Sequence, residues 1–313
     1  MSDTFSHEPV MLQEVLEVFA PIEDGVVVDA TVGGGGHAAA LLDAHDSIRL
    51  VGLDQDHEAL SAAAIALTRH RDRVQLRHAR FDRLGDELDA LNIDDIAGVL
   101  FDLGVSSYQL DAAPRGFSFR QDGPLDMRMD LSRGRSAADV VNGASDAELT
   151  DILRRFGDER HARRIASAII SHRPISTTAE LARVVLDAMP AASRRSPGHP
   201  ARRTFQALRI AVNEELDVLE PALDAAIERL RVGGRGAVLS YHSGEDRIVK
   251  RRLRRAAGLD RPTHHRLPVA DEEEPAITLM PRRGVTATPA EVSRYPRASS
   301  ARLRAFERAR GVM

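Results

Sequence analysis

The chain of 313 residues contains no cysteine and no tryptophan, and aromatic residues make up only 4% of it. The absence of cysteine excludes disulfide bonds, thiol catalysis and thiolate metal sites. Twelve histidines are present, but they show no H-E-x-x-H or similar spacing, and we expect no metal site. No apolar run has membrane-spanning length, and the N-terminus MSDTFSHEPV lacks a signal-peptide core. We therefore expect a cytoplasmic protein.

Lysine is almost absent as well. Lys250 is the only one among 43 Lys and Arg residues, and the formal net charge is −4. The distribution of charge matters more than its sum, and the stretches 194–209 and 250–266 are strongly basic and rich in arginine. Arginine binds phosphate bidentately, but GC-rich coding would produce the same preference over lysine. Charge alone leaves both interpretations open.

The first third of the chain alternates short apolar runs with helical patterns. A leading helix is expected over 8–20, and buried strands over 26–32, 48–56, 73–81 and 96–104. This alternation predicts an α/β fold with a doubly wound, parallel sheet. With 43% hydrophobic residues, the chain can form one large domain or two smaller ones.

The alternation stops after the fourth strand. Residues 105–135 have no clear period, and the segment 136–190 has a helical pattern. We therefore predict a discontinuous sheet domain over 1–107 and 204–313. An inserted helical domain is expected over 108–203.

The chain after the insertion is expected to rejoin the sheet. One long amphipathic helix is predicted over 204–230, followed by a fifth strand over 235–243. A long loop over 257–296 should contain one short strand near 277–280. The basic end of the chain, 297–310, is predicted to be an amphipathic helix.

Four consecutive glycines follow the first predicted strand, in the sequence VVVDATVGGGGH (26–37). Glycine loses the most conformational freedom on folding, so this run indicates a sharp turn or the close approach of a ligand. Ligands of open α/β sheets bind beyond the carboxyl ends of the strands, where this loop is expected. The residues predicted at that edge are Gly33 to Gly36, His37, Asp54, Phe81 and Asp102.

Alternatives remain for two of these residues and for the ligand. Asp54 lies about twenty residues after the loop, as an acid that binds a ribose diol does, but it could instead cap the next helix. Phe81 could line an adenine pocket or belong to the core. The loop suits the phosphates of NAD and also the methionyl part of S-adenosylmethionine. It does not decide between these cofactors.

The most distinctive stretch is FDLGVSSYQLDAAPRGFSFRQDGPLDMRMD (101–130). Four other motifs accompany it: HEPVMLQE (7–14), DATVGGGGHA (29–38), TFQALRIAVNEEL (204–216) and SYHSGEDRIVK (240–250). Together they resemble very closely the family of bacterial 16S rRNA cytidine N4-methyltransferases, the RsmH or MraW family. The departures are few, such as Ala38 where serine is usual and Gly244 where leucine is usual.

This resemblance implies a class I methyltransferase with a Rossmann-like sheet and a helical domain inserted after strand four for substrate recognition. It implies S-adenosylmethionine as the methyl donor and a specific cytidine in the decoding centre of 16S rRNA, on the small ribosomal subunit, as the substrate. By matching position, the residues that would line the cofactor pocket are Gly35, Gly36, His37, Asp54, Phe81, Asp102 and Gln109. Gln109 is implied by the resemblance alone.

The exocyclic amine of cytosine is a poor nucleophile, so an enzyme must orient it and accept a proton from it. We hypothesise that Asp102 holds the amine or the cofactor, assisted by Ser106 or Ser107. His242 and Asp126 are weaker candidates that could be structural.

RNA contacts are assigned to His242 and to the basic stretches, through Arg202, Arg203 and Arg251 in the cluster 251–255. A solvated helix face is the alternative for that cluster. Two rival functions are an NAD-dependent dehydrogenase, which leaves 101–130 unexplained, and a catalytically idle RNA-binding assembly factor. The expected partner is 16S rRNA within the small subunit, with no membrane, and the sequence leaves open whether a homodimer forms.

Overall fold

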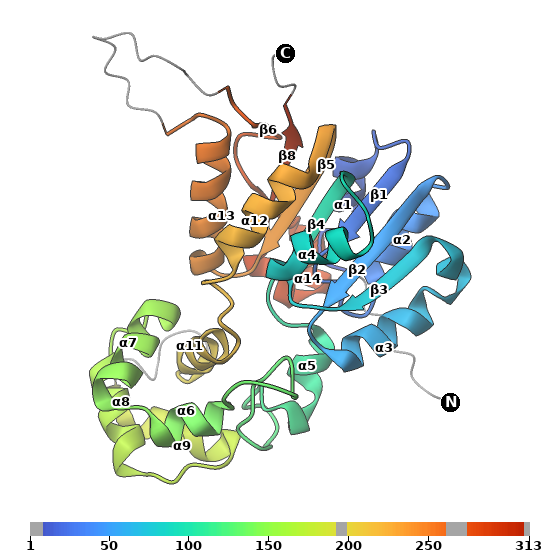
Figure 1. The fold of residues 1–313 in the computed structure, drawn as a ribbon. Coiled ribbons are helices and arrows are strands. Elements are labelled where there is room, and N and C mark those ends of the chain that lie inside the picture. Colours follow the sequence, from blue (N-terminus) through green and yellow to red (C-terminus); the bar gives the residue numbers. More distant parts are fainter. Residues whose placement is uncertain (1–8, 192–198, 261–273, 310–313) are drawn as a thin grey trace, which may run out of the picture. The chain divides into compact units, whose positions relative to one another are not determined.

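The computed structural model describes residues 9–191, 199–260 and 274–309. The chain divides into two compact units, drawn with their elements in Figure 1. We call Met1–Gly104 with Leu216–Met313 the sheet unit, and Val105–Glu215 the helical unit.

The sheet unit is built on one mixed sheet with the strand order β3-β2-β1-β4-β5-β8-β6, and β7 pairs with β8 off this path. The first five strands of the chain are parallel to their neighbours, whereas β8 is antiparallel to β5. The strands are β1 (Gly25–Asp29), β2 (Ile48–Asp54), β3 (Val74–His78), β4 (Ile96–Asp102), β5 (Leu230–Ser240), β6 (Ile277–Leu279), β7 (Val285–Thr286) and β8 (Arg302–Arg308). This arrangement confirms the predicted doubly wound α/β fold.

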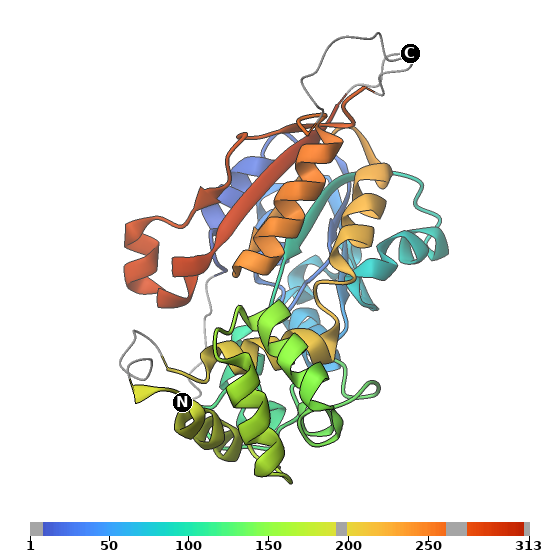
Figure 2. The same ribbon diagram turned by 90° about the vertical axis from the view of Figure 1, so that its left-hand side faces the viewer.

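Helices cover both faces of this sheet because its central strands are apolar on both sides. On one face, residues of α1 and α2 pack with alternate side chains of β1 and β2. On the other face, α4, α12 and α13 pack against β4 and β5, and α13 also lies beside β8 (Figure 2). The helices are α1 (Leu12–Phe19), α2 (Gly36–Ala44), α3 (His57–Ala66), α4 (Leu84–Ala90), α12 (Leu219–Arg229), α13 (Ser243–Ala256) and α14 (Pro289–Arg294). Short 3-10 helices are η1 (Thr68–Arg73), η2 (Phe81–Arg83) and η4 (Pro296–Ser300).

The helical unit has its own core, to which α6, α7, α8, α9 and α11 contribute apolar side chains. Serine and threonine begin several of these helices: Ser136 and Thr177 each form a capping box, and Ser145 accepts a hydrogen bond from the backbone of Glu148. The elements are α5 (Ser107–Asp111), η3 (Ala113–Arg115), α6 (Ala137–Gly143), α7 (Asp146–Gly157), α8 (Ala162–Ser171), α9 (Thr178–Ala188) and α11 (Arg202–Asn213).

The long helix predicted over 204–230 is wrong, and so is the domain boundary placed at 204. The segment forms two helices, α11 and α12, because Glu214 adopts a left-handed conformation with φ of 54°. Phe205 and Leu208 of α11 are buried in the core of the helical unit, so α11 belongs to that unit. At the other boundary, the helical unit begins at Val105 rather than at 108.

The helix predicted for the C-terminal stretch 297–310 is also wrong. Residues 302–308 form β8, which pairs with three other strands. The burial alternates along this strand: Leu303, Ala305 and Phe306 are buried, and Arg302 and Arg304 are partly exposed. Pairing within the sheet, rather than helical propensity, determines this conformation. The short strand expected near 277–280 is confirmed as β6, whereas 261–273 of the predicted loop lies outside the described residues.

No helix within the described ranges combines the length and the apolar character that a membrane span requires.

Candidate active site

The loop between β1 and α2 shows what the four glycines do. Gly33 and Gly35 have φ of 50° and 82°, in the left-handed region that favours glycine. A Cβ atom at Gly35 would lie 3.2 Å from the backbone of α3, and one at Gly36 would lie 2.6 Å from the Pro9 ring. A Cβ atom at Gly34 would meet no atom within 4 Å. The turn and its packing therefore require three of the glycines, and the backbone of the fourth faces open space.

Asp54, at the end of β2, is tied to this loop. Its Oδ2 atom accepts a hydrogen bond from the Gly33 backbone N–H at 2.9 Å, and its Oδ1 atom accepts one from Asp56 N–H at 2.9 Å. The cap of α3 is Asp56, whose side chain accepts from Glu58 N–H. The alternative in which Asp54 merely caps the following helix is therefore wrong.

Asp102, at the end of β4, is held by side chains from two other elements. The Tyr241 hydroxyl donates to Asp102 Oδ1 at 2.7 Å, and His37 Nδ1 lies 3.5 Å from Asp102 Oδ2. The other ring nitrogen of His37 lies 3.0 Å from the carbonyl oxygen of Val10, which can only accept, so a proton resides on Nε2. The Asp102 backbone N–H donates to Thr31 Oγ1, which fixes the end of β4 to β1.

Three carboxyl groups thus end neighbouring parallel strands of one sheet, at Asp29, Asp54 and Asp102. Burial raises the pKa of Asp29 to about 8 and that of Asp54 to about 6, although backbone hydrogen bonds oppose both shifts. Burial also raises the pKa of Asp102, and the charge of His37 and the Tyr241 hydroxyl oppose that shift. Groups with perturbed pKa values at a sheet edge are typical of a functional site.

Phe81 is the first residue of η2, three residues after the end of β3. Its ring packs edge-to-face on Phe101 with 6.1 Å between centroids, and it is only partly buried. It therefore supports the core on one side, and its exposed part is compatible with a ligand contact.

Ser106 and Gln109 belong to the helical unit, where they form the capping box of α5. The Ser106 hydroxyl accepts from Gln109 N–H at 3.2 Å, and Gln109 Oε1 accepts from Ser106 N–H at 3.0 Å. The Ser107 side chain lies outside the described residues. Asp126 binds the guanidinium of Arg128 with two hydrogen bonds of 2.8 and 2.9 Å. Ser106, Gln109 and Asp126 thus have local structural partners.

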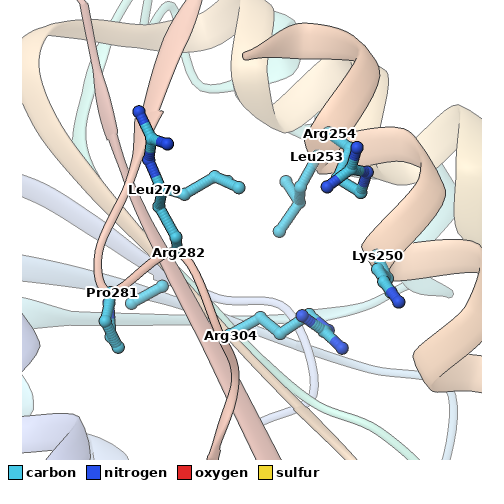
Figure 3. A pocket seen from close by; sticks show the side chains of 8 residues that line it. Lys250, Leu253, Arg254, Leu279, Pro281, Arg282 and Arg304 are labelled. Atoms are coloured by element: carbon cyan, nitrogen blue, oxygen red, sulfur yellow. The ribbon is translucent and has the colours of Figure 1, made fainter. Parts of the chain in front are cut away.

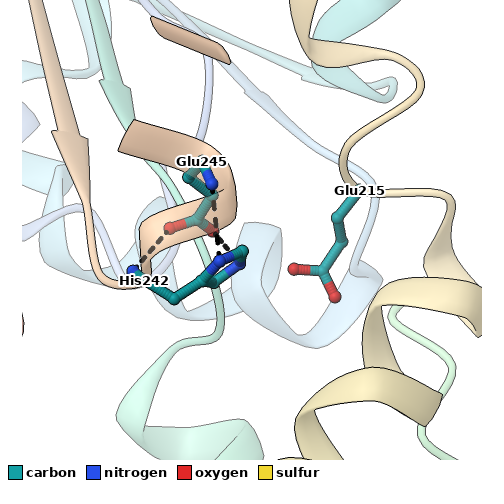
Figure 4. Close-up of side chains that lie close together, drawn as sticks. All are labelled: Glu215, His242 and Glu245. Carbon is teal, nitrogen blue, oxygen red and sulfur yellow. Dashed lines mark hydrogen bonds and ion pairs between the residues drawn. The ribbon is translucent and has the colours of Figure 1, made fainter. Parts of the chain in front are cut away.

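His242 is the N-cap of α13 (Figure 4). Its Nδ1 atom accepts from the backbone N–H groups of Gly244 and Glu245, and the buried Glu245 carboxylate accepts in return from His242 N–H. Because Nδ1 only accepts here, the ring proton resides on Nε2, 3.2 Å from Glu245 Oε1. Glu215, also drawn in Figure 4, belongs to the helical unit.

The predicted RNA-contacting arginines differ in their pairing. Arg251 donates to Glu220 Oε2 at 2.6 Å. In the helical unit, Arg203 donates to the carbonyl oxygen of Asp158 at 2.9 Å, and Arg202 is exposed.

The sequence analysis missed Asp29 and Tyr241 as parts of this site. Both could have been found by the rule that selected Asp54 and Asp102, because Asp29 ends β1 and Tyr241 directly follows β5.

Comparison with known families decides between the cofactors and functions left open above. Residues 4–309 match the model of the MraW methylase family. The chain belongs to this family. It is 51% identical over 311 residues to the ribosomal RNA small subunit methyltransferase H of Thermobifida fusca, covering 97% of this chain and 94% of that protein. Proteins of the same name from Saccharopolyspora erythraea (51% identity, 96% and 93% covered) and Streptomyces avermitilis (50%, 97% and 97%) are similar.

Membership of the MraW methylase family confirms the resemblance read from the motifs and makes the dehydrogenase interpretation wrong. S-adenosylmethionine is the cofactor of this methylase fold, and the sheet edge fits it. Gly34 leaves room at the loop for the methionyl part, and the Asp54 carboxylate is an acceptor at the end of β2, where a ribose would bind.

Proposed function

We propose that this chain methylates the N4 amine of a specific cytidine in the decoding centre of the small-subunit rRNA, with S-adenosylmethionine as the donor. The names of its curated relatives support small-subunit rRNA as the substrate. The close match of the 101–130 signature to cytidine N4-methyltransferases supports the target atom. The observation that carries the proposal is the anchored carboxyl group of Asp102 at the edge that also presents the glycine loop.

In this proposal the cofactor residues are Gly35, Gly36, His37, Asp54 and Phe81 in the sheet unit, with Gln109 from the helical unit. Bound S-adenosylmethionine supplies an electrophilic methyl group on its sulfonium. Asp54 accepts hydrogen bonds from the ribose hydroxyls, and the glycine backbone allows the methionyl part to approach closely. The helical unit recognises the RNA, with Arg202 and Arg203 as phosphate contacts.

Asp102 is the residue that orients the amine. Its carboxylate accepts a hydrogen bond from the N4 amine and directs the nitrogen lone pair toward the methyl group. Methyl transfer would form the N–C bond as the methyl–sulfur bond of the donor breaks, with S-adenosylhomocysteine as the leaving group. The nitrogen would become positive, and one of its protons would pass to the carboxylate and from there to water. Burial raises the pKa of Asp102, which makes its carboxylate a stronger base than an exposed one. Tyr241 and His37 hold this carboxylate in place, and Ser106 assists it.

The test is incubation of the protein with labelled S-adenosylmethionine and small ribosomal subunits that lack the modification, followed by nucleoside mass spectrometry. We expect N4-methylcytidine from the wild type. Asp102→Asn keeps the shape but not the basicity, and we expect it to lower the rate by about 100-fold or more. Its affinity for the cofactor, measured in the same preparation, separates a catalytic defect from an empty pocket. Full turnover by Asp102→Asn would exclude the proposed role, and a methylated base other than cytidine would exclude the proposed target.

A further inference from the structure

A pocket lies on the sheet unit between α13 and the strands β6 and β8, and β8 is two strands across the sheet from β4 (Figure 3). Four cationic side chains line it. Lys250 and Arg254 come from successive turns of α13, Arg282 from the loop after β6, and Arg304 from β8. Three segments far apart in the sequence therefore direct positive charge to one place.

The floor of this pocket is apolar. Leu253 and Ala305 are buried beneath the charged side chains, and Leu279 is partly buried beside them. An apolar floor weakens the dielectric screening around the surrounding cations and so strengthens their attraction for an anion. It also offers a surface for the aliphatic parts of a bound ligand.

Acidic side chains compensate only half of the positive charge. Arg304 donates to both oxygens of Asp246, at 2.8 and 3.1 Å, and Arg254 donates to Asp260 at 2.7 Å. Lys250 and Arg282 are exposed and have no hydrogen bond or ion pair with any residue that the structure describes. Counting only the residues that the structure describes, the pocket thus carries an excess of two positive charges.

The neighbouring arginines of α13 are different. Arg251 and Arg255 both lie near Glu220 of α12, with closest nitrogen–oxygen distances of 2.6 and 3.7 Å, and Arg252 pairs with Asp224. The basic cluster 250–255 therefore has two sides. One is compensated by α12, and the other opens into the pocket with unpaired charge.

We propose that this pocket binds the sugar–phosphate backbone of the RNA substrate, with Lys250 and Arg282 contacting phosphates. The proposal rests on the proposed function, which makes RNA the polyanion that the protein meets. Each unpaired cation that contacts a phosphate releases a condensed counterion, and the apolar floor accommodates the ribose. The compensated side, with Arg251 and Arg255, contributes little, because binding there would first require its ion pairs with Glu220 to break.

The first test uses the fact that Lys250 is the only lysine in the sequence. An amine-acetylating reagent is applied to the protein with S-adenosylmethionine alone and with S-adenosylmethionine plus unmodified small ribosomal subunits. Mass spectrometry then measures the acetylated fraction of the peptide that contains Lys250. We expect at least a several-fold lower acetylation rate in the presence of subunits. An unchanged rate under conditions where the subunits are bound and methylated would overturn the inference and leave the proposed function intact.

The second test compares two double variants of equal charge change. Lys250→Gln with Arg282→Gln removes the unpaired charges, and Arg251→Gln with Arg255→Gln removes paired ones. The logarithm of the binding constant for subunits is measured against the logarithm of KCl concentration at fixed Mg²⁺. We expect the first variant to make this negative slope shallower by about 1 to 2. The second variant should leave the slope near the wild-type value.

Equal slopes for the two variants, or a larger loss for the Arg251 and Arg255 variant, would contradict the proposal. A wild-type protein that neither binds nor methylates subunits would instead refute the proposed function, on which the inference depends. Denaturation curves of both variants verify that each is folded.

Discussion

Three acids at the edge of the sheet unit and two acids of the helical unit have pKa values that are shifted in opposite directions. At the sheet edge, burial raises the pKa values of Asp29, Asp54 and Asp102. In the helical unit, burial opposes the charge of Asp126, but the hydrogen bonds and charge of Arg128 outweigh it and lower the pKa of this carboxyl. Asp139 has a lowered pKa because the Ser136 side chain and backbone donate to it.

This difference distinguishes carboxylates whose charge stabilises the fold from carboxylates that are candidates for binding a ligand. A carboxylate with a lowered pKa is stabilised by its partners, so its charge contributes to folding. One with a raised pKa has partners that do not outweigh its burial, so its charge destabilises the free protein. Such a cost is typical of sites whose missing partner is a substrate or cofactor. The comparison therefore supports the proposal that the chemistry takes place at the sheet edge, although the helical unit holds most of the densest motif.

The largest effect that would sharpen this comparison is expected for Asp54→Ala. Removing the acceptor for the ribose hydroxyls should weaken S-adenosylmethionine binding by about 100-fold, since hydrogen bonds to a charged group contribute about 1.5–3 kcal/mol each. Asp56→Ala is the matched control: it removes the cap of α3 and should cost about 1 kcal/mol of stability with little change in affinity. Isothermal titration calorimetry measures the affinity of both variants for S-adenosylmethionine. Equal losses of affinity would mean that Asp54 acts only by shaping the loop.

The same carboxyl group should make cofactor binding depend on pH. Its pKa of about 6 leaves it mostly charged at pH 7 and protonated below pH 6. The Kd of the wild type should therefore rise by up to about tenfold per pH unit below pH 6, and that of Asp54→Ala should stay flat. A flat wild-type profile between pH 5 and 7 would show that a protonated Asp54 binds the cofactor equally well.

Asp29→Asn should reveal the cost of a buried acid at the sheet edge. Because its folded pKa is about 8 and the ordinary pKa of an aspartate is 3.8, the folded state retains one proton that the unfolded state loses between these values. Stability should therefore fall as pH rises through this window, by about 1.4 kcal/mol per pH unit for this group. The asparagine keeps an acceptor for Thr31 N–H and removes that contribution. Urea denaturation between pH 5 and 7.5 measures the slopes, and parallel slopes for variant and wild type would contradict the expectation.

The sequence predicted the sheet edge better than it predicted the rest. The parallel strands and their terminal acids could be predicted from short apolar runs. A strand that is buried on both faces has an almost continuous apolar sequence, which is easy to recognise. The C-terminal stretch 297–310 misled because its arginines and apolar residues also fit a helical period, and pairing with β5 decides its state. The break at Glu214 between α11 and α12 has no glycine or proline at the break itself, but Pro221 in the first turn of α12 is a signal against one continuous helix over 204–230.

The site itself was predicted only at the level of backbone position. Asp54 and Asp102 followed from their places at strand ends, but the Tyr241 hydroxyl on Asp102 joins residues 139 apart in the sequence. No local pattern encodes such a contact. The capping box of Ser106 and Gln109 is the opposite case, since S-x-x-Q before a short helix is a local signal from which it could have been predicted.

Asp126→Asn should show the reverse pH dependence in the helical unit. Its carboxylate binds Arg128 through both side-chain oxygens and is mostly buried. Losing the charge should destabilise the helical unit by about 1–2 kcal/mol at pH 7. Because the folded pKa of Asp126 is lowered, this contribution is present above pH 4 and is lost as pH falls through the folded value. Hydrogen exchange in α6 to α9 at pH 7 and denaturation at decreasing pH measure this contribution, and a difference between variant and wild type that does not shrink toward pH 3 would contradict the assignment.

Tyr241→Phe is expected to have the smallest effect, and it tests whether the sheet edge is tuned as well as buried. The change removes only the hydroxyl that donates to Asp102, and such a hydrogen bond contributes about 0.5–1.5 kcal/mol, or up to about 3 to a charged acceptor. Since the hydroxyl lowers the pKa of Asp102 against the effect of burial, its loss should raise that pKa further. The acid limb of the pH–rate profile for methyl transfer should then move to higher pH, while the affinity for S-adenosylmethionine stays near the wild-type value. A purely structural hydroxyl would instead lower the rate equally at every pH, so the direction of the shift, rather than the size of the loss, decides whether Tyr241 positions the carboxylate for chemistry.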